Sequence, residues 1–155
     1  AQFRDRSLLK EYRALVWGET ALQGSIALSL THDTRDRKKM RAILDPAKIQ
    51  RRQRVWPAST RFRRLATENG LSLLRIDMES GVMHQIRVHL AAIGHPLVGD
   101  SLYGSRPAEA LGLSRHFLHA CGLEFRHPRD GRRLRLDSRL PDELEEVLRG
   151  VGLRF

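Results

Sequence analysis

The densest set of reactive side chains lies in residues 84–89. His84, Gln85, Arg87 and His89 stand among apolar residues, and Arg87 follows His84 by three positions, so both occupy one helical face. A guanidinium on so apolar a helix is expected to be partly buried, where it requires a carboxylate or phosphate partner. Two interpretations stay open at this point. Arg87 either holds a catalytic acid or a substrate phosphate, or it extends along the helix to reach solvent.

The other histidines and the single cysteine offer weaker chemistry. His84, His89 and His95 do not have the i, i+4 spacing of a helical zinc site, which leaves a metal-dependent hydrolase as a minor alternative. His119 and Cys121 alternate to one face of an expected strand and would form a Cys–His nucleophile, although a small packed cysteine is the commoner role. One cysteine excludes an intramolecular disulfide framework. From this spacing of the histidines we expect no metal site.

The basic residues are unevenly distributed. The 155 residues contain 28 Lys and Arg against 18 Asp and Glu, a formal net charge of +10. Residues 35–54, here called the basic stretch, hold nine of the cations and two of the acids, and so carry +7. Neutralising phosphates releases counterions, and the forked guanidinium suits phosphate, so the stretch favours a nucleic-acid partner. The alternative is a solvated loop that reflects a general excess of arginine.

The composition also excludes several classes of protein. With 41% hydrophobic residues the chain can build a core, and its length is typical of one domain. No apolar run approaches the roughly 20 residues that span a bilayer, and the basic stretch lacks the amphipathic spacing of a membrane-surface helix. We therefore expect one globular domain and no membrane partner.

The elements that must position these residues begin with strands. Lys10–Trp17 has β-compatible residues, and Gly24–Leu30 alternates apolar and small polar residues with a period of two. Arg61–Thr67 and Leu71–Met78 are two further strand-like runs, and the Asn-Gly dipeptide at residues 69–70 predicts a hairpin turn between them. The basic stretch has weak periodicity and contains a proline, so we expect it to be mostly loop.

The second half of the chain predicts two helices and two more strands. Met83–Ile93 carries an apolar stripe at helical spacing and ends before Gly94. His116–His127 and Arg132–Ser138 are expected to pair as strands, and Asp142–Leu148 closes the chain as an amphipathic helix. Because no βαβ unit repeats, we predict an α+β fold with a mixed, largely antiparallel sheet and flanking helices.

Five groups of residues, in order along nearly the whole chain, resemble the motifs of one enzyme family. They are Lys10-x-Tyr12-x-Ala14-Leu15-Val16, Ala58-x-Thr60, Gly81-x-x-His84-Gln85-Ile86-Arg87-Val88-His89-Leu90, Gly94-His95-Pro96-Leu97-Val98-Gly99-Asp100-x-x-Tyr103-Gly104, and Leu118-His119-Ala120 with Leu123-x-Phe125-x-His127-Pro128 and Leu140-Pro141. On these motifs the chain resembles the RluA-type pseudouridine synthases. The resemblance implies the fold of their catalytic domain and isomerisation of uridine to pseudouridine in structured RNA, rRNA more often than tRNA.

The resemblance also implies roles for individual residues. A family tyrosine that stacks on the flipped base and is a candidate proton acceptor corresponds to Tyr12, and an arginine that pairs with a nucleophilic aspartate corresponds to Arg87. Leu118 matches a leucine that packs against the substrate pocket. His84, Gln85 and Asp100 match motif positions to which we assign structural roles. Residues of the basic stretch are expected to contact the RNA: Arg35, Arg37, Lys38, Lys39, Arg41, Arg51, Arg52 and Arg54.

The family further implies a cytoplasmic enzyme that uses no cofactor and acts on no DNA. Two departures stand out. The nucleophile of the family sits in a His-Arg-Leu-Asp type motif upstream of the tyrosine strand, and the 155 residues contain no such motif. Val82 stands where the family usually has arginine. We therefore expect residues 1–155 to be a partial catalytic domain lacking its N-terminal segment and inactive alone, or alternatively a non-catalytic RNA-binding module of the same fold.

Overall fold

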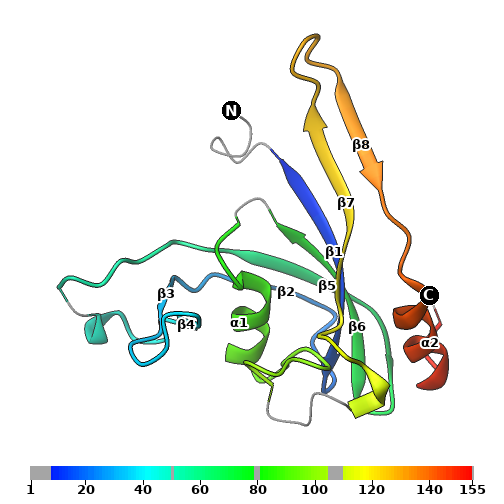
Figure 1. Ribbon diagram of the computed structural model, residues 1–155, viewed down its shortest axis with the longest axis horizontal. Coiled ribbons are helices and arrows are strands. Elements are labelled where there is room, and N and C mark those ends of the chain that lie inside the picture. The colour runs from blue at the N-terminus through cyan, green and yellow to red at the C-terminus, as the bar shows by residue number, and fades with distance from the viewer. Residues whose placement is uncertain (1–7, 50, 79–80, 105–109, 155) are drawn as a thin grey trace.

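The computed structural model describes residues 8–49, 51–78, 81–104 and 110–154 and is built on one antiparallel sheet (Figure 1). Its strands are β1 (Leu9–Trp17), β2 (Gln23–Ile26), β5 (Thr60–Glu68), β6 (Leu71–Met78), β7 (Leu118–Arg126) and β8 (Arg133–Asp137). They lie in the order β2-β5-β6-β1-β7-β8, and every adjacent pair is antiparallel. A separate hairpin joins β3 (Leu30–His32) to β4 (Met40–Ala42). The predicted α+β class is confirmed.

Two helices cover opposite faces of the six-stranded sheet. Alternate residues of β1 point to opposite sides, so Ala14 and Val16 pack in one cluster with helix α1 (Gln85–Ala92), while Leu15 packs in a second cluster with helix α2 (Asp142–Gly150). Figure 1 shows α1 on one side of the sheet and α2 on the other. The central strands therefore carry apolar side chains on both faces.

The β5–β6 hairpin follows directly from its turn residues. Asn69 and Gly70 have φ angles of 51° and 72°, the left-handed conformation that a two-residue hairpin turn needs at both positions. Asparagine and glycine adopt this conformation at low cost, which is why the dipeptide identifies the turn. The predicted hairpin is confirmed, with β5 and β6 within a residue or two of their expected bounds.

The predicted strand Gly24–Leu30 is interrupted in the structure. β2 ends at Ile26 and the separate strand β3 begins at Leu30. Between them the carbonyl of Leu28 lies 2.9 Å from Nε2 of His89 on α1. A side chain from another element thus takes up a backbone group that would otherwise have joined the ladder, and the alternating sequence carries no sign of this.

The basic stretch is mostly loop, as predicted, but it also contains β4 and a short 3-10 turn η1 (Pro46–Lys48). A third apolar cluster fastens it to α1, because Met40 of β4 and Leu30 of β3 are buried against Val88. Figure 1 shows the β3–β4 hairpin on the side of α1. Among the residues that the structure describes, no helix has the length and apolar character needed to cross a membrane.

Candidate active site

Helix α1 starts at a point that its own side chains fix. Gln85 accepts a hydrogen bond from the backbone N–H of Val82 (3.1 Å) and donates to the carbonyl of Ser59 (2.9 Å) and to Oγ1 of Thr60 (3.1 Å). Its side chain is buried, so these bonds satisfy an amide that could not remain unpaired. The first turn of α1 is thereby tied to the start of β5.

Arg87 forms a two-pronged ion pair with Asp100. Nε of Arg87 donates to Oδ2 (2.8 Å) and Nη2 donates to Oδ1 (2.7 Å); the Arg87 side chain is 11% exposed and that of Asp100 is fully buried. The expectation that a buried Arg87 requires an anionic partner is confirmed, and the alternative in which it extends to solvent is wrong. Nη1 of Arg87 has no hydrogen-bond partner in the part of the chain that the structure describes.

Asp100 is held from the other side by its own loop. The backbone N–H groups of Leu102 and Tyr103 donate to Oδ1 at 2.9 and 3.0 Å. Burial raises the pKa of the Asp100 carboxyl, but the hydrogen bonds from Arg87 and from these two N–H groups outweigh it and hold the pKa below its usual value. Asp100 is therefore a carboxylate with four donors, and its contacts are those of a residue that orients Arg87.

Tyr103 links Arg87 to the basic stretch. Its hydroxyl accepts the backbone N–H of Met40 (2.8 Å) and lies 2.9 Å from Nδ1 of His84, while its ring centroid lies 5.1 Å from the Arg87 guanidinium carbon. Burial, and secondly the charge of Arg87, lower the pKa of His84, so its neutral Nδ1 is suited to accept the hydroxyl proton. Tyr103 stands in the same sequence motif as Asp100, and the sequence alone indicates no role for it.

Tyr12 and Leu118 lie on the same face of the sheet as α1. Both are partly buried against the apolar cluster that contains Ile86 and Leu90 of α1. Tyr12 is paired with Ile76 on β6 and Ala120 on β7. Burial raises the pKa of the Tyr12 phenol, which is therefore protonated near neutral pH. The structure thus places Tyr12, Leu118 and α1 around one cluster.

Both ring nitrogens of His89 have structural partners. His89 is fully buried between Oγ1 of Thr60 and the carbonyl of Leu28, both at 2.9 Å, and burial lowers its pKa. Cys121 has a raised pKa, chiefly through burial, and contacts Arg13 and Glu11. No metal-binding group of three His, Cys, Asp or Glu side chains occurs among the described residues.

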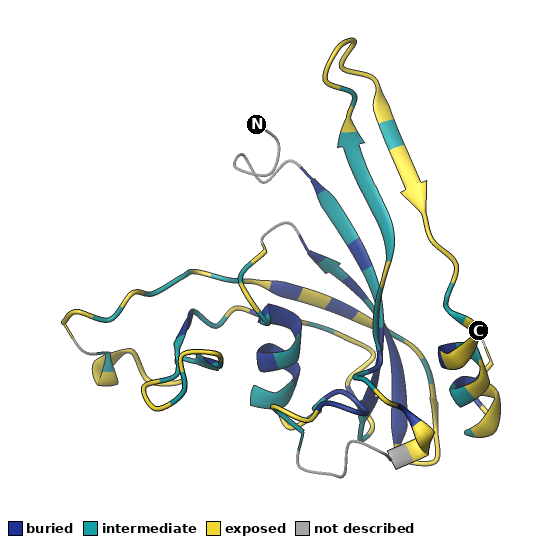
Figure 2. Ribbon diagram, viewed as in Figure 1, coloured by how far each residue is buried: buried dark blue, intermediate teal, exposed yellow. Residues whose placement is uncertain are grey.

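The residues predicted to bind RNA lie in the β3–β4 hairpin and in the segment that follows it to Trp56, together called the basic lobe, which Tyr103 links to α1. Asp33 shapes the first turn by accepting the backbone N–H groups of Arg35 and Asp36, and these bonds lower its pKa. The guanidinium of Arg54 lies 5.0 Å from the ring centroid of Trp56. Lys39 and Arg41 are half-buried, and the other predicted residues are exposed: Arg35, Arg37, Lys38, Arg51, Arg52 and Arg54. In Figure 2 the ribbon of this lobe is coloured mainly as exposed and intermediate.

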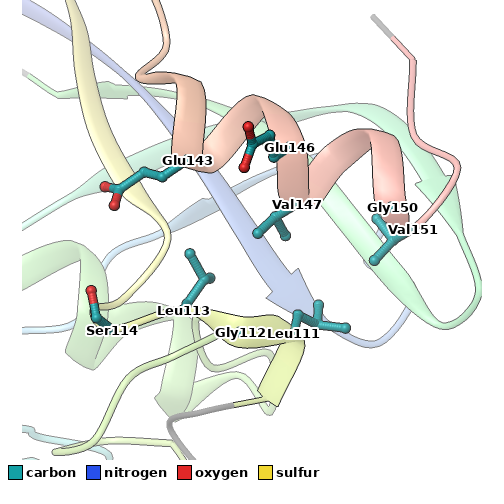
Figure 3. A pocket seen from close by; sticks show the side chains of 9 residues that line it. All are labelled: Leu111, Gly112, Leu113, Ser114, Glu143, Glu146, Val147, Gly150 and Val151. Carbon is teal, nitrogen blue, oxygen red and sulfur yellow. The ribbon is translucent and has the colours of Figure 1, made fainter.

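Two other features do not contribute to this site. The chain's one Arg-Leu-Asp triplet, Arg135 to Asp137, lies on β8, where Asp137 is 62% exposed and ion-pairs with Arg135 at 2.8 Å. A hollow of about 390 Å³ lies between α2 and residues 111–114 (Figure 3). It is lined by leucines and valines with Glu143 and Glu146 at its side, so it offers no cation to a phosphate.

Val82 changes the surroundings of α1 where the family usually has an arginine. Its side chain is partly buried against the cluster of Leu30, Met40 and Val88. An apolar side chain thus lies just before the start of the helix. Val82 therefore adds to the packing between α1 and the β3–β4 hairpin.

Fold and site together define an α+β domain in which a buried arginine–carboxylate pair and an aromatic sheet face lie beside a basic lobe. The family model described as RNA pseudouridylate synthase matches residues 1–92, and the chain belongs to this family, in its RluA-type branch. A protein of Chloroflexus aurantiacus described as an uncharacterized RNA pseudouridine synthase is 42% identical over 148 residues, covering 96% of the chain and 44% of that protein.

A further relative agrees with this assignment, and two solved structures share the fold. Ribosomal large subunit pseudouridine synthase D of Zymomonas mobilis is 36% identical over 151 residues, covering 94% of the chain and 45% of that protein. The chain spans about half the length of these relatives. The structure of human RNA pseudouridylate synthase domain containing 4 superposes with a TM-score of 0.77 at 22% identity, covering 99% of the chain and 66% of that structure. The structure of human RNA pseudouridylate synthase domain containing 1 superposes with a TM-score of 0.75 at 24% identity, covering 94% of the chain and 60% of that structure.

Proposed function

We propose that the protein isomerises uridine to pseudouridine in structured RNA, and that large-subunit rRNA is its substrate. The observation that carries the proposal is the orientation of Arg87 by the buried carboxylate of Asp100. Arg87 belongs to α1, which packs on the same sheet face as Tyr12 and Leu118. The relatives named as ribosomal large subunit synthases support rRNA over tRNA. We also place the protein in the cytoplasm, in agreement with a ribosomal substrate, and propose no DNA partner.

In the proposed reaction the bond between C1′ of the ribose and N1 of uracil breaks, and the base is re-attached to C1′ through carbon 5. Carbon 5 then loses its proton and N1 gains one, so the product is an isomer of uridine. The base must first leave its stack, because a base inside a helix cannot be reached. Tyr12 supplies an aromatic ring for stacking, and Leu118 closes the apolar side of the pocket. The free Nη1 edge of Arg87 is available to a second carboxylate, since Asp100 occupies the opposite edge.

The nucleophilic carboxylate comes, in this proposal, from sequence outside the 155 residues. They hold no His-Arg-Leu-Asp motif, and Asp137 of the one Arg-Leu-Asp triplet is exposed on β8. Residues 1–155 then form the C-terminal part of the catalytic domain and need that segment for turnover. The alternative, a non-catalytic RNA-binding module, is favoured by the same missing motif together with the retained basic stretch.

The test uses the full-length protein encoded with this chain and a large-subunit rRNA transcript, with pseudouridine detected by carbodiimide-primed reverse transcription. Arg87→Lys keeps the charge but loses the forked geometry, and it is expected to abolish product while RNA binding stays within about twofold. Arg149→Lys, an exposed arginine on α2, is the control. Full activity of Arg87→Lys would contradict the proposed role. Tight RNA binding without product in the wild type would favour the non-catalytic module.

A further inference from the structure

The sheet carries a row of like charges on the face away from α1. Arg63 of β5 stands directly opposite Arg75 of β6, and Arg75 stands directly opposite Arg13 of β1. Directly opposed side chains in an antiparallel pair lie on one face with Cβ atoms about 5 Å apart, and like charges there are destabilising. Three arginines in one row therefore require anions to compensate them.

Compensation is present at one end of this row. Glu11 is buried and accepts Arg13 at 2.6 Å and Arg75 at 3.1 Å, and Asp77 pairs with Arg75 at 3.2 Å. The hydrogen bonds from Arg13 and from the neighbouring Arg135 outweigh burial, which alone would raise the pKa of Glu11, and keep it ionised. The charges of Arg13 and Arg75 are thus compensated by carboxylates of the protein itself.

The outer end of the row is uncompensated. The side chain of Arg63 is exposed and has neither an ion pair nor a hydrogen bond to any residue that the structure describes. Phe62 on the same strand points into the apolar cluster of α1, so Arg63 points to the opposite face. Figure 2 shows the resulting alternation of buried and exposed residues along β5.

Arg63 lines a shallow hollow of about 610 Å³ on this second face. Its lining includes three cations, one carboxylate and two neutral polar side chains: Arg61, Arg63, Arg75, Asp77, Gln23 and Ser25. Cations outnumber the carboxylate, and amide and hydroxyl groups add hydrogen-bond donors. Guanidinium forks with such donors are suited to a phosphate group.

The strands that line the hollow, β2 and β5, lead along the chain to the two ends of the basic lobe. Ile26 at the end of β2 is paired with Thr60, and the bridge between Leu30 and Trp56 lies next along the same two chain segments. β2 has four residues and lies at one edge of the described sheet, with β8 at the other. A strand of nucleic acid that leaves the basic lobe can therefore reach the second face by crossing this short edge.

We propose that this hollow binds a backbone phosphate of the RNA substrate, so that the RNA passes around the β2 edge and contacts both faces of the sheet. The proposal rests on the proposed function for the identity of the polyanion. The net charge of +10, and the pairing of the two chain segments that lead from the hollow to the basic lobe, favour an RNA strand over an acidic peptide. A phosphate there would complete the compensation of the arginine row.

The experiment compares Arg63→Gln with Arg149→Gln in the full-length protein. Binding to a fluorescent large-subunit rRNA transcript is measured at several KCl concentrations, and thermal unfolding is measured without RNA. Arg63→Gln is expected to lower affinity about fivefold at low salt and to reduce the salt-dependence slope by about 1, because one phosphate contact is lost. Its melting temperature should stay unchanged or rise, because a repulsion with Arg75 is removed.

The control Arg149→Gln should change neither quantity. If wild-type protein binds the rRNA but Arg63→Gln leaves affinity and slope unchanged, the phosphate site is wrong while the proposed function stands. If the wild type shows no salt-dependent rRNA binding, the proposed function itself fails. Loss of affinity accompanied by a lower melting temperature would mean a structural role for Arg63 and would also overturn the site. The site would likewise be wrong if Arg63→Gln weakened the binding of polyglutamate but not the binding of rRNA.

Discussion

The Arg87–Asp100 pair makes a prediction that needs no substrate. In Asp100→Asn the side chain keeps its size, but an amide NH2 comes to face the guanidinium N–H groups of Arg87. Because the Asp100 side chain is fully buried and that of Arg87 is 11% exposed, little water can reach the charge left behind. Breaking a buried ion pair by removing one partner costs 3–5 kcal/mol, and the partial access of Arg87 puts this case at about 3 kcal/mol. For a chain of this size that lowers the melting temperature by about 9 °C.

The pH dependence identifies the charge as the cause. The pKa of Asp100 is lower in the folded protein than its unfolded value of about 3.9. The carboxylate therefore contributes its full stability above that value and loses it as the pH falls through the folded pKa, by up to about 1.4 kcal/mol per pH unit. The stability difference between wild type and Asp100→Asn should thus be largest at neutral pH and shrink below about pH 4.

Urea unfolding of the 155-residue chain from pH 7 to pH 3 measures this difference directly. Glu11 and Asp33 also have lowered pKa values, but they are present in both proteins and cancel. Glu19→Gln is the matched control, because Glu19 is 66% exposed in its pair with Arg64 and should change stability by less than about 0.5 kcal/mol. A loss below about 1 kcal/mol at pH 7, or one that stays constant down to pH 3, would refute the reasoning.

Three further predictions concern the proposed substrate. Tyr12→Phe should keep RNA affinity within about twofold, whereas Tyr12→Leu should weaken it by about 1–3 kcal/mol through lost stacking; equal affinities in filter binding would exclude stacking. Arg51→Gln with Arg52→Gln should reduce the salt-dependence slope by about 2, and an unchanged slope would remove this part of the basic stretch from the interface. Tyr103→Phe keeps the ring beside Arg87 but loses two hydrogen bonds; steady-state kinetics should show a raised KM for RNA with kcat little changed, and the reverse would contradict a link to the basic lobe.

Local signals in the sequence predicted most of the fold. The Asn-Gly turn, the helical stripe of α1 and the amphipathic α2 each depend on residues within one element, and each was predicted within a few positions. The sequence of residues 24–30 does not predict the break between β2 and β3, because a contact made at the break comes from a distant part of the chain. His89, more than sixty residues away, bonds to the carbonyl of Leu28, and no property of residues 24–30 records that.

The site divides in the same way. Burial of Arg87 and its need for an anion followed from the apolar helix around it, but the identity of the partner did not. Asp100 lies thirteen residues further on, in a loop whose backbone N–H groups fix it. The arginine row was also invisible, because Arg13, Arg63 and Arg75 become neighbours only through the register of three strands.

Tyr103 connects the basic lobe to Arg87 through direct contacts. One side chain contacts Met40 of the lobe through its hydroxyl, His84 at the start of α1 through the same hydroxyl, and Arg87 through its ring. Met40 and Val88 pack together beside it, so the lobe cannot shift without moving α1 or breaking these contacts. Phosphate binding that shifts the basic lobe would therefore also shift the guanidinium of Arg87, which Asp100 orients. RNA binding and the placement of Arg87 are in this sense one structural unit, although they come from segments that the sequence separates by more than thirty residues.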